Sequence, residues 1–237
     1  MPELELKKRP KNPIIIEGFP GFGLVGTITT EFLIEHLKTE HIGRITLEDA
    51  PAMVAIHENK LVEPMGLFYN EKYNILILHS INSAPGTEWK IAEMIRGLAK
   101  DLDAKEIICI EGVGSSAETD ESRVFYFSNN PEKDTTFRNL KIEPLQEGII
   151  MGVTSALLLK MEEMPISAIF AETHSNLPDS KAAAKIIGAL DKYLHLDVDP
   201  KPLLQTAQKF EEKLKGIITS SSEAARMKDE KTLSYFG

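Results

Sequence analysis

The sequence predicts an α/β fold in which a mixed β-sheet is flanked by helices. Short apolar runs, such as 14–16 and 107–110, indicate buried strands. Segments with apolar residues at helical spacing, such as 88–102, lie between them. This alternation is typical of βαβ units, in which helices cover both faces of a sheet. Two further apolar runs, 67–69 and 75–78, flank a short polar turn and predict a hairpin. The sheet should therefore be mixed and not purely parallel.

The elements before residue 80 begin with the strand at 14–16. Five glycine and proline residues follow within a short stretch, and they indicate a tight turn that leads into a helix over about 27–37. The runs 45–47 and 53–56 predict two more strands before the hairpin.

The elements after residue 80 repeat the alternation of helices and strands. A turn of small residues, Ser83-Ala84-Pro85-Gly86, precedes the first of them. In chain order we expect a helix over 88–102, strands at 107–110 and 124–127, a helix over 149–160, a strand at 167–171 and a helix over 181–194.

The character of the sequence changes near residue 197. A charged, proline-containing linker should end the preceding helix, so we expect an α/β core domain over 1–197. An amphipathic helix over 198–218 and a flexible tail over 219–237 should follow. The helix carries an apolar seam, and we expect this seam either to lie on its own domain or to mediate self-association or partner binding. Its members include Leu203, Phe210, Leu214 and Ile217.

Composition limits the classes of partner. The chain has 237 residues and a net charge of −9, which argues against a nucleic-acid or anionic-membrane surface, since both need clustered Lys and Arg. Cys109, the single cysteine, lies in an apolar strand and indicates a small buried hydrophobe. The first residues lack the pattern of a signal peptide, and no stretch is long and apolar enough to span a membrane. We therefore expect a soluble protein of the cytoplasm.

The glycine-rich turn carries a literal dinucleotide-binding pattern. Gly21, Gly23 and Gly26 match G-x-G-x-x-G between a strand and a helix, and Glu48 stands where an acid could bind a ribose. Four residues separate the strand from the first glycine, and bulky rings flank the glycines, which weakens the match. The competing interpretation is a tight turn that packs against its own domain or a neighbouring subunit.

Other polar groups give weaker signals. Glu172, Thr173 and His174 follow a strand, with Asp179 shortly after, and could form a metal or acid–base site, although a loop that caps the next helix explains them as well. Ser115 lacks the sequence context of a nucleophilic serine. The remaining histidines have no ligand spacing. The sequence thus predicts no metal site and no cofactor.

Three short motifs in their order resemble the archaeal proteasome assembly chaperone family. They are Gly18-Phe19-Pro20-Gly21-Phe22-Gly23-Leu24-Val25-Gly26, Ser83-Ala84-Pro85-Gly86 and Glu111-Gly112-Val113-Gly114. The resemblance spans roughly residues 10 to 195 and extends to the C-terminal helix and tail. It implies a fold similar to nucleoside phosphorylases, without evidence of their catalytic residues. It also implies homo-oligomers that bind the α-subunits of the proteasome core particle.

The resemblance assigns docking to Tyr235, Phe236 and Gly237. Family members end in a hydrophobic residue, a tyrosine and any last residue; here Tyr235 takes the hydrophobic position and Phe236 replaces the tyrosine. A free carboxylate can meet a lysine, and the ring can fill a cleft between subunits. Because Phe236 lacks a hydroxyl, one tail should bind weakly, and several tails on one oligomer should bind together.

The sequence as a whole predicts a non-enzymatic chaperone or ATP-independent activator of the proteasome. The alternative is a nucleotide-binding or phosphorylase-like enzyme that uses the Gly21–Gly26 loop.

Overall fold

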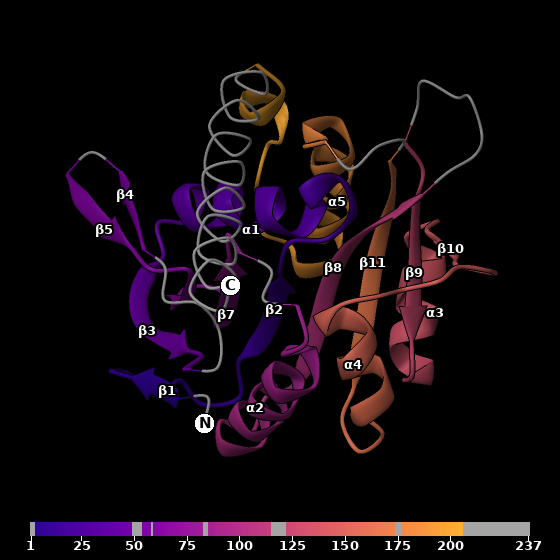
Figure 1. Cartoon of the computed structure of the whole chain (residues 1–237). Helices are drawn as coiled ribbons and strands as arrows, with labels where there is room; N and C mark the ends of the chain where they lie inside the picture. The colour runs from indigo at the N-terminus through magenta and orange to yellow at the C-terminus, as the bar shows by residue number, and fades with distance from the viewer. Residues whose placement is uncertain are drawn as a thin grey trace, which may run out of the picture.

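A computed structural model of the chain describes residues 3–48, 54–57, 59–82, 85–114, 122–173 and 177–205. Within these residues the strands form one nine-stranded sheet and one separate hairpin (Figure 1). The sheet has the order β1-β3-β6-β7-β2-β8-β11-β9-β10. Its strands are β1 (Glu3–Leu6), β2 (Ile14–Gly18), β3 (Glu40–Thr46), β6 (Met65–Asn70), β7 (Ile75–Ser80), β8 (Glu106–Gly114), β9 (Val124–Ser128), β10 (Glu143–Pro144) and β11 (Ile166–Thr173). The hairpin is formed by β4 (Ala55–His57) and β5 (Lys60–Val62).

The sheet is mixed, as the sequence predicts. Its centre consists of the parallel strands β7, β2, β8 and β11, whereas β6, β3 and β1 are joined antiparallel on one side and β9 is antiparallel to β11 on the other. All six residues of β7 and all eight of β11 are buried. Parallel strands covered on both faces are expected to contain apolar runs, as in residues 75–78 of β7 and 168–171 of β11.

Helices cover both faces of the sheet. The first face packs against α2 (Glu88–Asp101) and α4 (Val153–Lys160), and the second packs against α1 (Val25–His36), α3 (Pro131–Asn139) and α5 (Ser180–Leu194). Figure 1 shows α2 next to α4 and α1 next to α5. Neighbouring residues of one strand serve opposite layers: Ile15 lies in the core under α2 and α4, and Ile16 lies in the core under α1 and α5.

Side-chain caps fix where two helices begin. The Asn130 side chain accepts hydrogen bonds from the backbone N–H groups of Glu132 and Lys133, and Pro131 occupies the first turn of α3. The Asp179 side chain accepts from the backbone N–H of Ala182 at the start of α5. Asp179 thus belongs to the loop that caps this helix, which is one of the two interpretations raised by the sequence.

Two helices differ from the sequence-based expectation. The predicted helix over 149–160 begins only at Val153, because Gly152 has a φ of +85° that a regular helix cannot include. The segment before it crosses the sheet face irregularly, and Ile150 packs into the core. Helix α3 was not predicted at all, since Phe137 is its one buried residue and leaves no apolar period to detect.

The chain after α5 stays in contact with the core domain. Leu196, Val198 and Leu203 are buried in the same core as α1 and α5, and residues 201–205 are helical. The predicted boundary after residue 197 therefore separates residues that share one core. Residues 206–237, which hold the rest of the predicted helix and the whole predicted tail, lie outside the described residues. None of the helices described is both long and apolar enough to cross a membrane.

Candidate functional site

The parallel strands at the centre of the sheet all end at the same edge. β2 ends at Gly18, β7 at Ser80, β8 at Gly114 and β11 at Thr173. Open α/β sheets collect their ligand groups at this carboxyl edge. The glycine-rich turn and most of the polar residues noted in the sequence lie there.

The glycine-rich turn is a compact loop with a left-handed backbone. After β2 the chain forms a 3₁₀ turn over Phe22–Leu24 and enters α1 directly. Gly23 has φ +64° and Leu24 has φ +51°, so two successive residues are left-handed. Glycine tolerates this conformation, but it is uncommon for a leucine.

The glycines of this loop allow close packing against neighbouring strands of the same chain. A Cβ on Gly21 would lie 1.7 Å from the carboxyl Oε1 of Glu111, and a Cβ on Gly23 would lie 2.8 Å from Oγ1 of Thr173. On Gly26 it would lie 2.7 Å from a backbone carbonyl of β8. Because these three residues have no Cβ, the loop can pack closely against β8 and β11. In a dinucleotide site the same freedom serves a pyrophosphate.

Glu48 does not lie beside the loop. It follows β3, which is separated from β2 by β6 and β7. Strands in a sheet are about 4.8 Å apart, so β3 lies about 14 Å from β2. The Glu48 residue is exposed, whereas the acid of a dinucleotide site follows the strand next to the glycine loop. The arrangement thus differs from a dinucleotide-binding one.

Two buried carboxyl groups lie beneath the loop on the face of the sheet covered by α2 and α4. Glu17 on β2 is 1% exposed and Glu111 on β8 is 8% exposed. Oγ1 of Thr154, in the first turn of α4, lies 3.2 Å from Oε2 of Glu17 and 3.3 Å from Oε2 of Glu111. No Lys, Arg or His among the described residues forms an ion pair with either carboxyl group.

Burial without a cation favours the protonated forms of both carboxyl groups. Removal from water raises the pKa of Glu17 to about 7. Burial, and then the nearby charge of Glu17, raise the pKa of Glu111 to about 8. Burial and the same carboxyl group raise the pKa of the Cys109 thiol, which donates a hydrogen bond to Glu17. A thiol of this kind is a poor nucleophile, so Cys109 fits the predicted role of a small buried hydrophobe.

The space next to the acid pair is small. A cavity of about 50 Å³ is lined by both carboxyl groups together with Phe19 and Asn82. Pockets for small-molecule ligands usually measure about 300–1,000 Å³. The cavity can hold about one or two water molecules and is too small for a nucleoside.

Glu172 and Thr173 lie inside β11 and not in the loop after it. Glu172 is 5% exposed and accepts two hydrogen bonds from the Arg123 guanidinium, at 3.0 Å from Nε and 2.7 Å from Nη2. Thr173 packs against Gly23. His174 and Ser115 lie outside the described residues. Among the residues described, no group of three or more His, Cys, Asp and Glu side chains could hold a metal ion.

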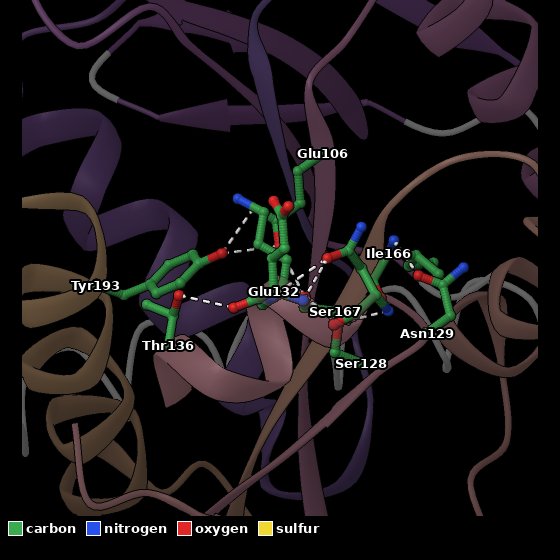
Figure 2. Close-up of polar contacts among 10 residues, drawn as sticks. Glu106, Ser128, Asn129, Glu132, Thr136, Ile166, Ser167 and Tyr193 are labelled. Atoms are coloured by element: carbon green, nitrogen blue, oxygen red, sulfur yellow. Dashed lines mark hydrogen bonds and ion pairs between the residues drawn. The ribbon is translucent and has the colours of Figure 1, made fainter. Parts of the chain in front are cut away.

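A third buried carboxyl group, Glu106, lies at the opposite end of β8 and is fully paired. It is 0% exposed and lies 2.8 Å from Nζ of Lys133. The Tyr193 hydroxyl donates to it at 2.8 Å, and the Ser167 hydroxyl donates at 2.7 Å (Figure 2). Figure 2 shows the network continuing from Ser167 to Ser128. This cluster joins β8, β11, α3 and α5 through one ion pair and several hydrogen bonds, so it holds these elements together.

His79 forms a triad-like arrangement that lacks access to substrate. Its Nδ1 lies 2.8 Å from Oγ1 of Thr30, and its Nε2 lies 3.1 Å from a carboxyl oxygen of Glu31. A hydroxyl, an imidazole and a carboxylate in this order can activate a nucleophile. Thr30 is 0% exposed, however, and its hydroxyl also lies 2.9 Å from the carbonyl oxygen of Gly26. The arrangement therefore braces the start of α1.

The predicted docking residues lie at the other end of the chain. Tyr235, Phe236 and Gly237 fall outside the described residues, as do Phe210, Leu214 and Ile217 of the predicted seam. Leu203 is described, and its 2% exposure places it against its own domain. For this first member of the seam, the structure favours packing on the core over contact with a partner.

The acid pair was not predicted from the sequence, although the position of Glu17 in a buried strand was a visible sign of one of its members. Glu17 directly follows three isoleucines within a strand that is buried on both faces. A carboxyl group in such a run must be paired, hydrogen-bonded or protonated. The partnership with Glu111 and Thr154 had no signal, because it joins positions far apart in the sequence.

Comparison with known proteins finds one matching family model and several similar solved structures. A family model described as the PAC2 family matches residues 15–218. A crystal structure of Pyrococcus furiosus PbaA, described as an archaeal homolog of proteasome-assembly chaperone, is 30% identical and has a TM-score of 0.85. The match covers 95% of this chain and 100% of that one.

Two further relatives are similar over most of their length. Pyrococcus furiosus PbaB, described as an archaeal proteasome activator, is 25% identical with a TM-score of 0.76, and the match covers 91% of this chain and 98% of that one. An uncharacterized protein of Methanocaldococcus jannaschii is 28% identical over 209 residues, which is 87% of this chain and 86% of that one. The predicted architecture, a mixed sheet flanked by helices, is the one these solved structures share.

Proposed function

This chain belongs to the PAC2 family, and from that membership we propose that it serves as a proteasome assembly chaperone or ATP-independent proteasome activator. The observation that carries the proposal is the similarity to PbaA over 95% of the chain at 30% identity. The similarity to PbaB, a protein described as a proteasome activator, supports it. The two descriptions differ, so the proposal covers both assembly and activation.

The contact with the core particle is made through the C-terminal end of the chain. Tyr235 and Phe236 supply two aromatic rings, and Gly237 carries the terminal carboxylate. A carboxylate next to a lysine forms a charge-assisted hydrogen bond that orients the tail. A ring buried between two α-subunits adds apolar contact area. These are the two parts that a docking tail needs.

The protein acts as a homo-oligomer in the cytoplasm. Phe236 cannot make the hydrogen bond of a tyrosine hydroxyl, so one tail binds weakly. Several tails on one oligomer raise the effective concentration of the second and later contacts. Oligomerisation is therefore the condition under which this tail holds the core particle.

The catalytic sites belong to the partner and not to this chain. The glycine loop is filled by groups of β8 and β11, and the cavity beside the acid pair has only about 50 Å³. Both features argue against the nucleotide-binding alternative. Incubation with NAD or a nucleoside at millimolar concentration should leave the melting temperature unchanged, and a clear upward shift would revive that alternative.

Deletion of the last three residues tests the docking proposal. The full chain should co-sediment with archaeal proteasome core particles, and the chain without Tyr235, Phe236 and Gly237 should not. Size-exclusion chromatography must show the same oligomer for both proteins. Co-sedimentation that survives the deletion would contradict the role of the tail.

A single substitution provides the matched control. In Phe236→Tyr the ring is kept and a hydroxyl is added, so affinity should rise by about 0.5–1.5 kcal/mol if the hydroxyl finds a partner. Phe236→Ala should weaken binding because the ring contact is lost. Equal affinity for all three proteins would show that this side chain takes no part in docking.

A further inference from the structure

A second and larger depression lies at the carboxyl edge of the sheet, and its described lining includes no residue of the glycine loop. It measures about 650 Å³, which is within the range of ligand-binding clefts. One wall consists of Val113 on β8, Phe125 on β9 and Glu172 on β11. The opposite wall is the segment 143–149, which leaves β10 and crosses toward α4 (Figure 1). We name this depression the edge groove.

The crossing segment has backbone groups that do not pair with the described part of the chain. Leu145 N–H donates to the Tyr126 carbonyl at 2.8 Å, which is the last ladder-like bond on the way out of the sheet. From residue 146 to residue 151, no backbone N–H donates to another described residue. Exposed backbone groups beside a sheet can pair with an added strand.

At the end of this segment one inward-facing side chain lies between two exposed ones, whereas residues 146–148 are all exposed. Ile149 is 90% exposed and Met151 is 76% exposed, whereas Ile150 between them packs into the core. Large apolar side chains at such exposure are among the most accessible on the described surface. Grouped beside a groove, they indicate a contact with another polypeptide.

The charge of the edge groove is negative. Glu143, Glu147 and Glu172 line it, and Arg123 is the positively charged residue among its lining residues. The Arg123 guanidinium is already committed to Glu172, with contacts of 2.7 and 3.0 Å. Arg123 also attracts Glu143, but three carboxylates face one guanidinium in the described lining, so the groove remains negative and Glu147 has no ion pair with a described residue. The chain as a whole has a net charge of −9.

We propose that the edge groove binds an extended segment of a partner protein in which basic residues alternate with apolar ones. The backbone of the segment pairs with residues 146–151, its apolar side chains contact Phe125 and Ile149, and its basic side chains face Glu143 and Glu147. This contact does not use the C-terminal tail. It therefore stands or fails separately from the proposed docking.

Fluorescence anisotropy with synthetic peptides tests the proposal on the full chain. The probe is a labelled peptide of alternating lysine and valine, with an alternating glutamate and valine peptide as the charge control. A third peptide has the first sequence with alternate backbone nitrogens methylated, which removes the N–H donors of one edge. The lysine–valine peptide should bind at least tenfold more tightly than either of the others.

Two charge-reversal variants locate the site. Glu147→Lys should weaken binding of the lysine–valine peptide about fivefold, because an attraction becomes a repulsion at an exposed position. Glu162→Lys has the same charge change at an exposed residue outside the groove, and its affinity should equal that of the unchanged chain. Both positions are exposed, so both variants should fold normally.

Several results would overturn the proposal. Equal affinity for the lysine and glutamate peptides, or equal effects of the two variants, would exclude a charge-selective groove. Failure of every peptide to bind, together with a changed sedimentation coefficient in Glu147→Lys, would assign the groove to a second copy of this chain. Binding that emerges only after deletion of residues 235–237 would assign it to the chain's own end.

Discussion

Strand β8 carries two buried glutamates whose carboxyl groups have different partners: one has a cation and the other has a second carboxyl group. Glu106 and Glu111 are five positions apart and therefore point to opposite faces of the sheet. Glu106 lies 2.8 Å from the Lys133 ammonium and accepts hydrogen bonds from two hydroxyl groups. Glu111 shares the Thr154 hydroxyl with another carboxyl group, Glu17.

These different partners indicate different roles for the two ends of β8. A buried carboxylate with a cation joins the elements around it, and removal of one partner leaves an uncompensated charge. A buried carboxyl pair without a cation has raised pKa values, so it takes up protons near neutral pH and not near pH 4.5. The amino end of β8 is thus a structural joint, and its carboxyl end is a titratable support beneath the glycine loop.

Among single substitutions at constant pH, removal of the cation from the first site should have the largest effect. Lys133→Ala leaves Glu106 buried and unpaired, so the free energy of unfolding should fall by about 3 kcal/mol at pH 7. Urea denaturation measures it. Lys185→Ala, at an exposed position of α5, is the matched control and should change stability by less than about 0.5 kcal/mol. Equal effects of the two substitutions would remove the distinction between the two ends of β8.

The acid pair should reveal itself in the pH dependence of stability. An unfolded glutamate has a pKa near 4.5, whereas the folded values are about 7 for Glu17 and about 8 for Glu111. The folded state therefore binds more protons between pH 4.5 and 8. The contribution of the pair is fully present below pH 4.5 and is lost as the pH rises through 7 to 8.

The double variant Glu17→Gln, Glu111→Gln isolates this contribution. The unchanged chain should lose on the order of several kcal/mol relative to the variant as the pH rises from 4.5 to 8, because the pKa values of both carboxyl groups are raised, from 4.5 to about 7 and about 8. Denaturation curves of both proteins across this range measure the difference. A difference that does not depend on pH would show that the pair does not carry the proton assigned to it.

A smaller effect should come from the contact that joins the loop to the acid pair. A Cβ on Gly112 would lie 2.0 Å from the carbonyl oxygen of Phe22, and the backbone N–H groups of these two residues donate hydrogen bonds to Glu111. Gly112→Ala should therefore displace the loop and cost about 2 kcal/mol. Gly97→Ala in α2 has open space and should stabilise the chain by about 0.5–1 kcal/mol. Destabilisation in both variants would point to a general cost of added volume.

The sequence was sufficient for the main elements of the fold because their apolar periods are strong. Strand β8 and helix α2 lie close to their predicted positions, since each has a continuous run or a regular helical spacing. Helix α3 was missed because its stability comes from the Asn130 cap and one buried ring, Phe137. The start of α4 was misplaced because a glycine at φ +85° interrupts an otherwise apolar segment.

The candidate sites were harder to predict because their chemistry depends on long-range pairing. Glu106 and Glu111 are both single acids in one strand, and nothing near them in the sequence distinguishes their surroundings. Lys133 and Tyr193 come from two separate helices, and Thr154 comes from a third. The glycine pattern was visible, but a pattern cannot tell whether its open side faces a ligand or the protein's own strands. The tail prediction rests on sequence and family, and its residues lie outside the described part of the chain.

Electron microscopy of the full chain mixed with archaeal core particles tests whether the C-terminal tail docks on them. We expect additional density on the ends of the cylinder, over the α-subunits, which disappears when residues 235–237 are deleted. Bare cylinder ends at saturating protein, or end density that persists without the last three residues, would contradict docking through the C-terminal tail.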